Sequence, residues 1–301
     1  MVKYKCLPIY LAIIFINIIE GKRMSNYDRR IQICAVGFEY ERVIEGVNKF
    51  TSNVIYLLKS YKRLEDSNQS TKKMIEIAET FVNSLKEHFE STKICSPVVV
   101  KTNITKLEDM IKELCKIIKK ELEKDVSQIF INISTANKLF ASAAMYVGSF
   151  YPEKIKIFYL SASDYIINDL IYEDIKSIPE FIAKFNKKGM TYKKNENSYE
   201  IVQVPSYPID LNLLKENKKK ILKGIRELSE TSKNEWVSLM KILGHIQKED
   251  PHDKKIKMRY HNHFNYLKQR GFLDEKIPIK EKYYKLTKQG EILALILTYL
   301  G

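Results

Sequence analysis

The chain has 301 residues, of which 45% are hydrophobic, 10 are glycine and 8 are proline. This length and composition fit two packed domains and exclude a repeat or low-complexity protein. The formal net charge of +14 favours a polyanionic partner. The segment from Lys215 to Gly301 carries +9 of this charge, with 20 Lys and Arg against 11 Asp and Glu. The four cysteines show no zinc-binding or disulfide spacing, which is typical of a cytoplasmic protein.

The first 23 residues are treated apart from the fold. An apolar run from Leu7 to Ile19 follows Lys3 and Lys5, as in a signal peptide, but it is too short for a typical membrane span. No small-residue cleavage site follows it. We expect an upstream mis-assigned start with Met24 as the initiator, while a membrane anchor and a secretory signal are the alternatives. No membrane partner is expected.

Short β-branched, apolar runs alternate with amphipathic helical segments between residues 30 and 204. The expected strands are Arg30–Val36, Asn53–Leu58, Val98–Lys101, Gln128–Ile133, Lys154–Leu160 and Tyr199–Val204. The expected helices are Tyr40–Phe50, Thr71–Phe89, a segment around Leu107 to Ile118, and Lys138–Phe150. In the second helix, Ile75, Ala78, Val82, Leu85 and Phe89 share one face. This alternation predicts an α/β fold with a Rossmann-like parallel sheet covered on both faces.

The pattern changes near a proline-rich stretch between Pro205 and Pro208, which we take as a domain boundary. The predicted domains are residues 24–208 and 209–301. The second is expected to be mainly helical. Its expected helices are Leu214–Ser229, Glu235–Gln247, Lys254–Arg270 and Thr287–Leu300, with turn and strand character from Lys276 to Leu286.

Three helices, a hairpin-like segment and a last helix follow the order of a winged helix-turn-helix. The helix Lys254–Arg270 interleaves cationic residues with Met258, Phe264 and Leu267 at core spacing. Thr287 is expected to cap the last helix. A solvated charged face is the alternative interpretation of the basic helix.

This organisation predicts a double-stranded DNA partner. Phosphate contacts are expected from Lys254, Lys255, Lys257 and Lys285, and base contacts from Arg259, His261 and Asn262. A metal site made by His252, His261 and His263 is not expected, because residues two apart on a helix point to different sides.

Polar loops follow two of the predicted strands, where ligands bind in open parallel sheets. The first loop is Val36–Arg42 and the second is Asn132–Lys138. Hydroxyls of Ser134 and Thr135 at a helix start, with the cation of Lys138, suit a phosphate. Simple helix capping by the Ser or Thr is the alternative. No G-x-G-x-x-G and no Walker A motif occurs, so no cofactor is expected.

From Arg30 to Gly301 the chain resembles regulators in which a CRISPR-associated Rossmann-fold (CARF) domain precedes a winged helix-turn-helix. The residues that carry the resemblance are VGFEYERVIEGV at Val36–Val47, VIYLL from Val54, INISTANKLFASAAM at Ile131–Met145, and the C-terminal YYKLTKQG. The resemblance implies a homodimer that senses a cyclic oligoadenylate or related nucleotide and regulates transcription through its DNA-binding wings.

The resemblance also implies a ligand pocket. Its expected residues are Gly37, Phe38, Glu39 and Arg42 in the first loop, and Ser134, Thr135, Asn137 and Lys138 in the second. Many CARF domains have a glycine-richer second loop, where this chain has Ala136 and Asn137. The alternative function is a ring nuclease, in which Lys138 and Ser134 stabilise phosphate charge while a ribose 2′-hydroxyl attacks in line. We expect a protein that is not an enzyme, because the pocket shows no histidine; His88 lies on the second helix.

Overall fold

The computed structural model describes most of the chain after residue 27. The described ranges are 28–60, 69–135, 137–171, 178–191, 199–204, 214–247, 250, 253–278 and 281–300. The apolar N-terminal segment, the expected domain boundary near residue 208, Ala136 and His252 lie outside them. None of the helices in the described ranges is long and apolar enough to cross a membrane.

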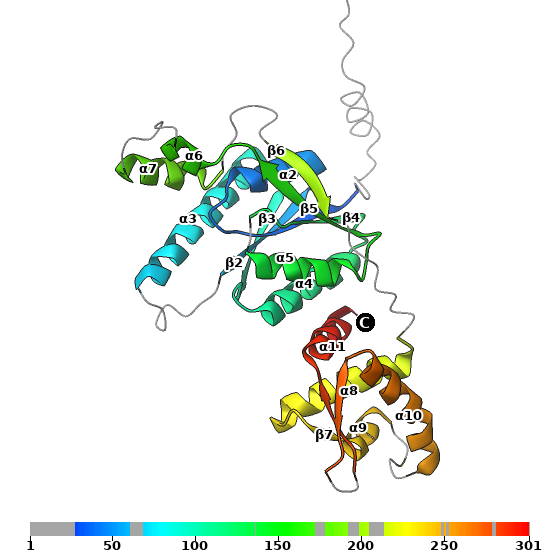
Figure 1. The fold of residues 1–301 in the computed structure, drawn as a ribbon. Helices are drawn as coiled ribbons and strands as arrows, with labels where there is room; N and C mark the ends of the chain where they lie inside the picture. Colours follow the sequence, from blue (N-terminus) through cyan, green and yellow to red (C-terminus); the bar gives the residue numbers. More distant parts are fainter. Residues whose placement is uncertain are drawn as a thin grey trace, which may run out of the picture.

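A six-stranded sheet organises residues 30–204 (Figure 1). Its strands are β1 (Arg30–Ala35), β2 (Val54–Ser60), β3 (Ser96–Thr102), β4 (Gln128–Asn132), β5 (Ile155–Ala162) and β6 (Tyr199–Val204). The order is β3-β2-β1-β4-β5-β6, and the first five strands run parallel. The predicted α/β class and parallel sheet are therefore confirmed. The last strand differs, because β6 pairs antiparallel with β5.

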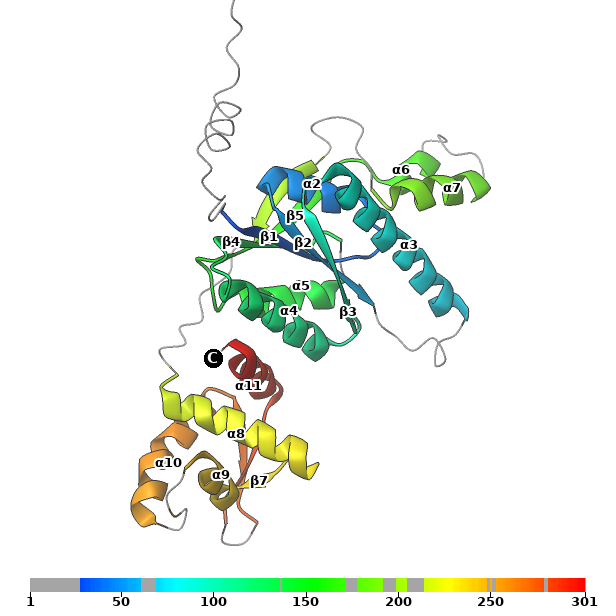
Figure 2. The same cartoon turned by 180° about the vertical axis from the view of Figure 1, so that it is seen from behind.

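Helices cover both faces of this sheet, as expected for a buried parallel sheet. The helices are α2 (Glu41–Phe50), α3 (Gln69–Thr92), α4 (Leu107–Leu122) and α5 (Lys138–Gly148). Helices α2 and α3 pack on one face, against side chains such as Cys34 and Leu57. Helices α4 and α5 pack on the other, against Ile33 and Leu58 (Figures 1 and 2).

Two further helices follow β5, where the sequence pattern indicates no regular structure. They are α6 (Ile166–Ile171) and α7 (Ile178–Lys188). Phe185 of α7 packs against Phe38 and Phe81 at ring-centroid distances of 5.8 and 5.9 Å. The chain then returns to the β1 loop, where Met190 N donates to Phe38 O at 2.9 Å. This insertion therefore supports the loop that follows β1.

The C-terminal region combines helices with a small antiparallel sheet of order β7-β9-β8. Its elements are α8 (Glu216–Ser232), β7 (Val237–Ser238), α9 (Leu239–Ile246), α10 (Lys254–Gln269), β8 (Leu273–Lys276), β9 (Tyr283–Leu286) and α11 (Lys288–Leu300). The single helix expected from Glu235 to Gln247 is wrong at its start. There, Val237 and Ser238 pair with β9, and Ser238 then caps α9 by accepting from Lys241 N at 3.4 Å.

The packing of α10 confirms two of its three expected core residues. Phe264 and Leu267 are buried, and the Phe264 ring stacks on Tyr284 of β9 at 4.4 Å. Met258 is instead 66% exposed, so its predicted core position is wrong. The predicted cap of the last helix is confirmed, because Thr287 Oγ1 accepts from Gly290 N at 3.1 Å.

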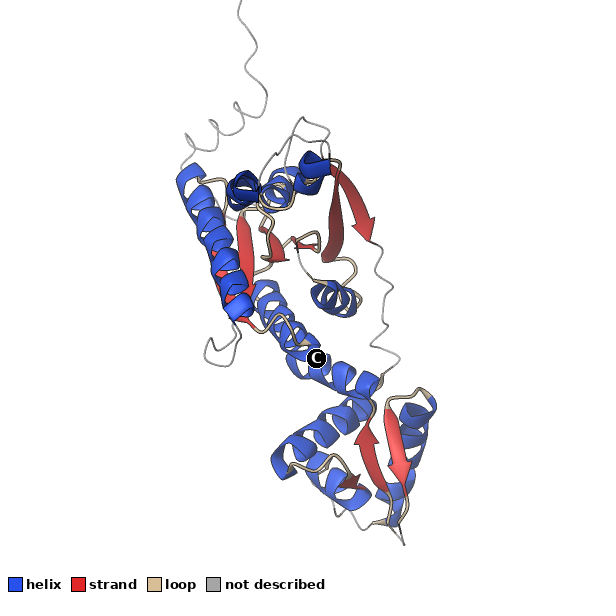
Figure 3. Ribbon diagram, turned by 60° about the vertical axis from the view of Figure 1, so that its left-hand side comes forward, coloured by secondary structure: helices blue, strands red, loops and turns tan. Residues whose placement is uncertain are grey.

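Helix α11 joins the two regions of the chain. It packs against both α4 and α8 (Figure 3). Its residues from Ile292 to Leu297 are all buried, so this stretch of the helix is apolar on every side. Tyr151 OH donates to Leu300 O at 3.0 Å, and Lys288 binds Glu108 at the start of α4. The hydrophobic core consequently continues from the six-stranded sheet into the C-terminal region.

A buried carboxylate, Glu121, fixes the other end of α4. It accepts from Arg29 Nε at 2.5 Å, Tyr56 OH at 2.6 Å and Lys124 Nζ at 3.1 Å. Burial alone would raise the pKa of Glu121, but these three hydrogen bonds outweigh it and lower the pKa to about 2. The native state therefore favours the ionised carboxylate.

We predict that Glu121→Gln destabilises the chain by about 1–3 kcal/mol at pH 7, because donors of Arg29 and Tyr56 lose their charged acceptor. In the wild type, this stabilisation is complete above the ordinary pKa of 4.5 and is lost as the pH falls toward about 2. Urea unfolding at several pH values measures both effects. Glu123→Gln, at an exposed position of the same helix end, is the control. Equal acid sensitivity in both variants would contradict the assignment.

Candidate functional site

A pocket of about 620 Å³ lies at the carboxyl ends of β1, β2 and β4. Both predicted loops contribute to it. The predicted residues that line it are Gly37, Phe38, Glu39, Ser134, Thr135 and Asn137. The strand order reverses between β1 and β4, and this switch point is where open α/β sheets bind ligands. Six of the eight residues expected at the ligand site are thus brought together.

The two loops lie in direct contact with each other. Thr135 Oγ1 donates to Ala35 O at 2.7 Å, across the ends of β4 and β1. A Cβ atom on Gly37 would lie only 2.7 Å from Thr135 O, so glycine is required for this close approach. The floor of the pocket is therefore formed by direct contact between the loops.

The second loop uses its polar groups differently from the sequence expectation. Asn137 caps α5, with its Oδ1 accepting from Phe140 N at 2.9 Å, while its Nδ2 donates to Ile104 O at 2.8 Å. Ser134 Oγ accepts from Leu160 N at 2.6 Å. Neither Ser134 nor Thr135 caps the helix, and both hydroxyls already hold neighbouring strands together.

Arg42 lies behind the pocket and does not line it. Its side chain is 4% exposed, with Nη1 donating to Ser134 O at 3.2 Å and Nη2 donating to Tyr165 OH at 3.0 Å. Its guanidinium also lies over the rings of Tyr159 and Tyr165, at 5.4 and 5.5 Å. Arg42 therefore connects the first loop to the second and positions both.

Glu39 is a buried carboxylate at the edge of the pocket. Thr191 Oγ1 donates to its Oε2 at 2.5 Å, and Arg42 Nη1 lies 3.6 Å from its Oε1. Burial raises the pKa of Glu39, although Arg42 and Thr191 act in the opposite direction. The carboxylate thus ties the first loop to the segment that follows α7.

The cation expected in the pocket comes from a different residue. Lys138 is exposed at the first turn of α5 and lies outside the lining. Among the described lining residues the cation is Lys59, at the end of β2, which pairs with Glu79 of α3 at 2.9 Å. An anionic ligand that enters the pocket would compete with Glu79 for this ammonium group.

Sequence reasoning missed the other walls of the pocket. The missed lining residues include Lys59 and Ser60 at the end of β2, Ile75, Ala78 and Glu79 on α3, Ile104 and Thr105 after β3, and Met190. The sequence did contain a signal for the α3 wall. Ile75 and Ala78 extend the apolar face of Val82 and Leu85, but only Val82 and Leu85 belong to the core that packs on the sheet. Asn132 is a polar residue at the end of an apolar strand, and this position in the sequence indicates a structural role. Its buried side-chain amide donates to Arg42 O at 3.1 Å.

The residues expected to meet DNA lie mainly on one helix. On α10, Lys254, Lys255, Arg259, His261 and Asn262 are exposed and Lys257 is half-buried. Lys285 is placed elsewhere. Its neighbours Tyr284 and Leu286 face the core against α10, so Lys285 points to the other side of the sheet and pairs with Glu235 at 2.9 Å.

The exposed start of α10, the end of β8 and the start of β9 lie at the same end of the C-terminal region (Figures 1 and 2). This end points away from the six-stranded sheet. Asp253 caps the helix there, with its Oδ1 accepting from Lys255 N at 2.8 Å. The chain therefore presents a basic helix start beside the paired ends of two strands, at the far end from the pocket.

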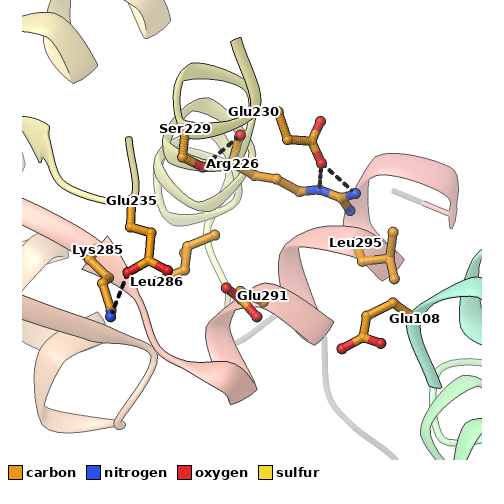
Figure 4. Close-up of a pocket in the computed structure, with 9 residues that line it drawn as sticks. All are labelled: Glu108, Arg226, Ser229, Glu230, Glu235, Lys285, Leu286, Glu291 and Leu295. Atoms are coloured by element: carbon orange, nitrogen blue, oxygen red, sulfur yellow. Dashed lines mark hydrogen bonds and ion pairs between the residues drawn. The ribbon is translucent and has the colours of Figure 1, made fainter. Parts of the chain in front are cut away.

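A second pocket, of about 320 Å³, lies where α4, α8, β9 and α11 meet (Figure 4). Its charged groups are largely paired. Arg226 Nη2 donates to Glu230 Oε1 at 2.8 Å, and the hydrogen bond from Lys288 lowers the pKa of Glu108. The second pocket is therefore lined by ion pairs where the two regions of the chain meet.

Comparison with known proteins gives one family match. A family model described as "HFX_2341_N:-like, N-terminal" matches residues 30–165, which is less than half of the chain. No curated protein matches. Csm6 of Enterococcus italicus, solved bound to cyclic hexa-2′-fluoro-hexa-dAMP, is similar at 10% identity and a TM-score of 0.37, covering 81% of this chain and 56% of Csm6.

Two other solved structures are similar at the same level. A type III CRISPR defence DNA nuclease activated by cyclic oligoadenylate shows 10% identity and a TM-score of 0.33, over 62% of this chain and 35% of the nuclease. Can2 from Sulfobacillus thermosulfidooxidans, in complex with cyclic tetra-adenylate, shows 9% identity and a TM-score of 0.29, over 88% and 61%. The chain thus covers less than two thirds of each of the three proteins, and these low scores establish no shared activity.

We predict that Gly37→Ala destabilises the chain by about 1–3 kcal/mol, because the added methyl group must push the first loop away from Thr135 O. Urea unfolding measures the loss. Ala35→Gly, two residues earlier at the end of β1, is the companion variant, because it adds no atom beside Thr135 O. Unchanged stability of Gly37→Ala would contradict the close approach of the two loops.

Proposed function

We propose that this protein is a homodimeric, ligand-responsive transcriptional regulator. Its N-terminal α/β region binds a cyclic oligoadenylate or related nucleotide, and its C-terminal region binds double-stranded DNA. The observation that carries the proposal is one continuous hydrophobic core. It joins the sheet region, which has a pocket at its switch point, to the C-terminal region, which has a basic helix and paired strands.

The position of the pocket supports a nucleotide ligand. Its apolar walls include Phe38, Ile75 and Ile104, which can pack against a base, and Lys59 offers a cation to a phosphate. Backbone amides at the loop after β4 precede the start of α5, where a partial positive charge favours anions. The sequence resemblance to CARF regulators supplies the nucleotide class.

The order of elements in the C-terminal region supports DNA binding. The sequence α8-β7-α9-α10-β8-β9 places a helix pair before a two-stranded turn, as in winged helix-turn-helix proteins. Helix α10 takes the place of the recognition helix. We propose phosphate contacts from Lys254, Lys255 and Lys257, which would give a salt-dependent affinity.

Helix α4 supports coupling between the two sites. It begins at Leu107, two residues after Thr105, which lines the pocket together with Ile104, and one side of the helix packs against α11. A ligand that displaces the loop after β3 would therefore shift the contact surface of α11. Coupling energies of about 1–3 kcal/mol are ordinary for such switches.

The first test is a thermal-shift titration of the full chain with cyclic oligoadenylates of different ring sizes. We expect one ring size to raise the melting temperature, because a ligand at about 100 times its Kd stabilises the native state by about 2.7 kcal/mol. Ala78→Trp should abolish the rise by filling the pocket. Asn83→Trp, exposed on the same helix but outside the lining, should retain it.

Either of two results would contradict the ligand assignment. A melting temperature that no ring size raises would show that the pocket does not bind this class of nucleotide. A rise that persists in Ala78→Trp would place the ligand elsewhere. Chromatography of the recovered nucleotide separates sensing from turnover. Intact ligand is the expected result, whereas linear products would assign ring nuclease activity to the same pocket.

The second test measures DNA affinity against salt concentration. We expect Lys254→Ala to weaken binding to all duplexes alike and to reduce the slope of log K against log salt by about 1. Lys285→Ala is the matched control, because its side chain lies on the sheet face opposite α10. Equal slopes for the wild type and Lys254→Ala would remove α10 from the interface.

A further inference from the structure

Helix α10 presents an uncharged stripe directly opposite its packed face. The packed residues are Ile256, Tyr260, Phe264 and Leu267, all buried. The helical repeat of 100° per residue, about 3.6 residues per turn, places Met258, Asn262 and Asn265 on the other side. These three residues follow an i, i+4, i+7 pattern, so they form one line along the helix, in which Met258 and Asn262 are exposed and Asn265 is half-buried.

Cationic residues flank this stripe on both sides. By the same helical geometry, Lys255 and Arg259 lie along one edge, and Lys254 and Lys257 along the other. Exposure of a single apolar side chain is common and would mean little by itself. Here, however, the 66% exposed Met258 stands between two lines of positive charge that suit the two phosphate backbones of a groove.

The chemistry of the stripe matches one kind of base pair. An asparagine amide offers a donor and an acceptor together, which complement N7 and N6 of adenine in the major groove. An apolar side chain such as that of Met258 contacts the methyl group of thymine. Guanine, by contrast, is read mainly by Arg or Lys, and the stripe contains neither.

We infer that Met258, Asn262 and Asn265 form a specificity stripe that reads A·T base pairs in the major groove. This inference rests on the DNA-binding function proposed above and names the sequence class that the function requires. Asn262 has no hydrogen-bond partner among the described residues, so its amide is available to a base. Asn265 keeps its Oδ1, since its Nδ2 lies 2.9 Å from His261 Nε2.

The spacing of the three side chains along α10 determines which base pairs they can reach. At about 1.5 Å rise per residue, Met258 and Asn262 lie about 6 Å apart along the helix, and Asn262 and Asn265 about 4.5 Å. Successive bases lie about 3.4 Å apart along one strand. The three side chains therefore reach pairs about one to two steps apart, within one short A·T-rich run.

The test is a binding selection with the full chain from a pool of duplexes whose central positions are randomised. We expect the recovered duplexes to share such a run of A·T pairs. Asn262→Ala should lose the preference at one position and bind the selected duplex about 5- to 150-fold more weakly, equivalent to about 1–3 kcal/mol. Its affinity for a duplex of G·C pairs alone should stay the same.

Matched variants separate base reading from a general loss of structure. Asn83→Ala changes an equally exposed asparagine on α3 and should leave the selected sequences unchanged. Met258→Ala should relax the thymine preference, and Met258→Leu should preserve it. Because Asn83, Met258 and Asn262 are exposed, each variant should melt within a few degrees of the wild type.

The outcomes distinguish the stripe from the DNA-binding function itself. Recovered duplexes rich in G·C pairs, or an A·T preference unchanged in Asn262→Ala, would overturn the stripe while DNA binding stands. Failure to recover any duplex at low salt would overturn the DNA-binding proposal and the stripe with it.

Discussion

Helix α4 is buried on two sides, and the rest of the architecture depends on this. One side, with Ile111 and Leu114, packs on the sheet, and the helix also packs against α11. Its first turn follows the pocket wall at Ile104, while Glu121 fixes its last turn to the end of the sheet near Arg29. Packed cores resist continuous deformation, so a change at the pocket would shift α4 as a unit.

Much of the fold could be predicted from the sequence, because buried parallel strands are apolar throughout and the helices between them are amphipathic. The strand order and the antiparallel β6 could not, since they depend on pairings between distant segments. Residues 237 and 238 were expected in a helix, as part of the segment Glu235–Gln247. Only the register with Tyr283 and Tyr284 makes them a strand.

The candidate site was predicted in position but only partly in chemistry. Gly37 and Thr135 lie where the loops after β1 and β4 were expected to meet. The hydroxyl of Ser134 was expected to face a phosphate, but it accepts from the backbone of β5, because a buried polar group needs a partner. Lys59 was missed because its place in the pocket follows from β2 lying beside β1, which no local pattern indicates.

The central claim is that pocket and DNA surface are coupled, and one measurement tests it most directly. The Kd of the full chain for a selected duplex is determined without and with a saturating cyclic oligoadenylate, and the Kd for the nucleotide without and with saturating DNA. Our account predicts that both constants change by the same factor, about 5- to 150-fold, since linkage is reciprocal. Two constants unchanged by the other ligand would contradict it.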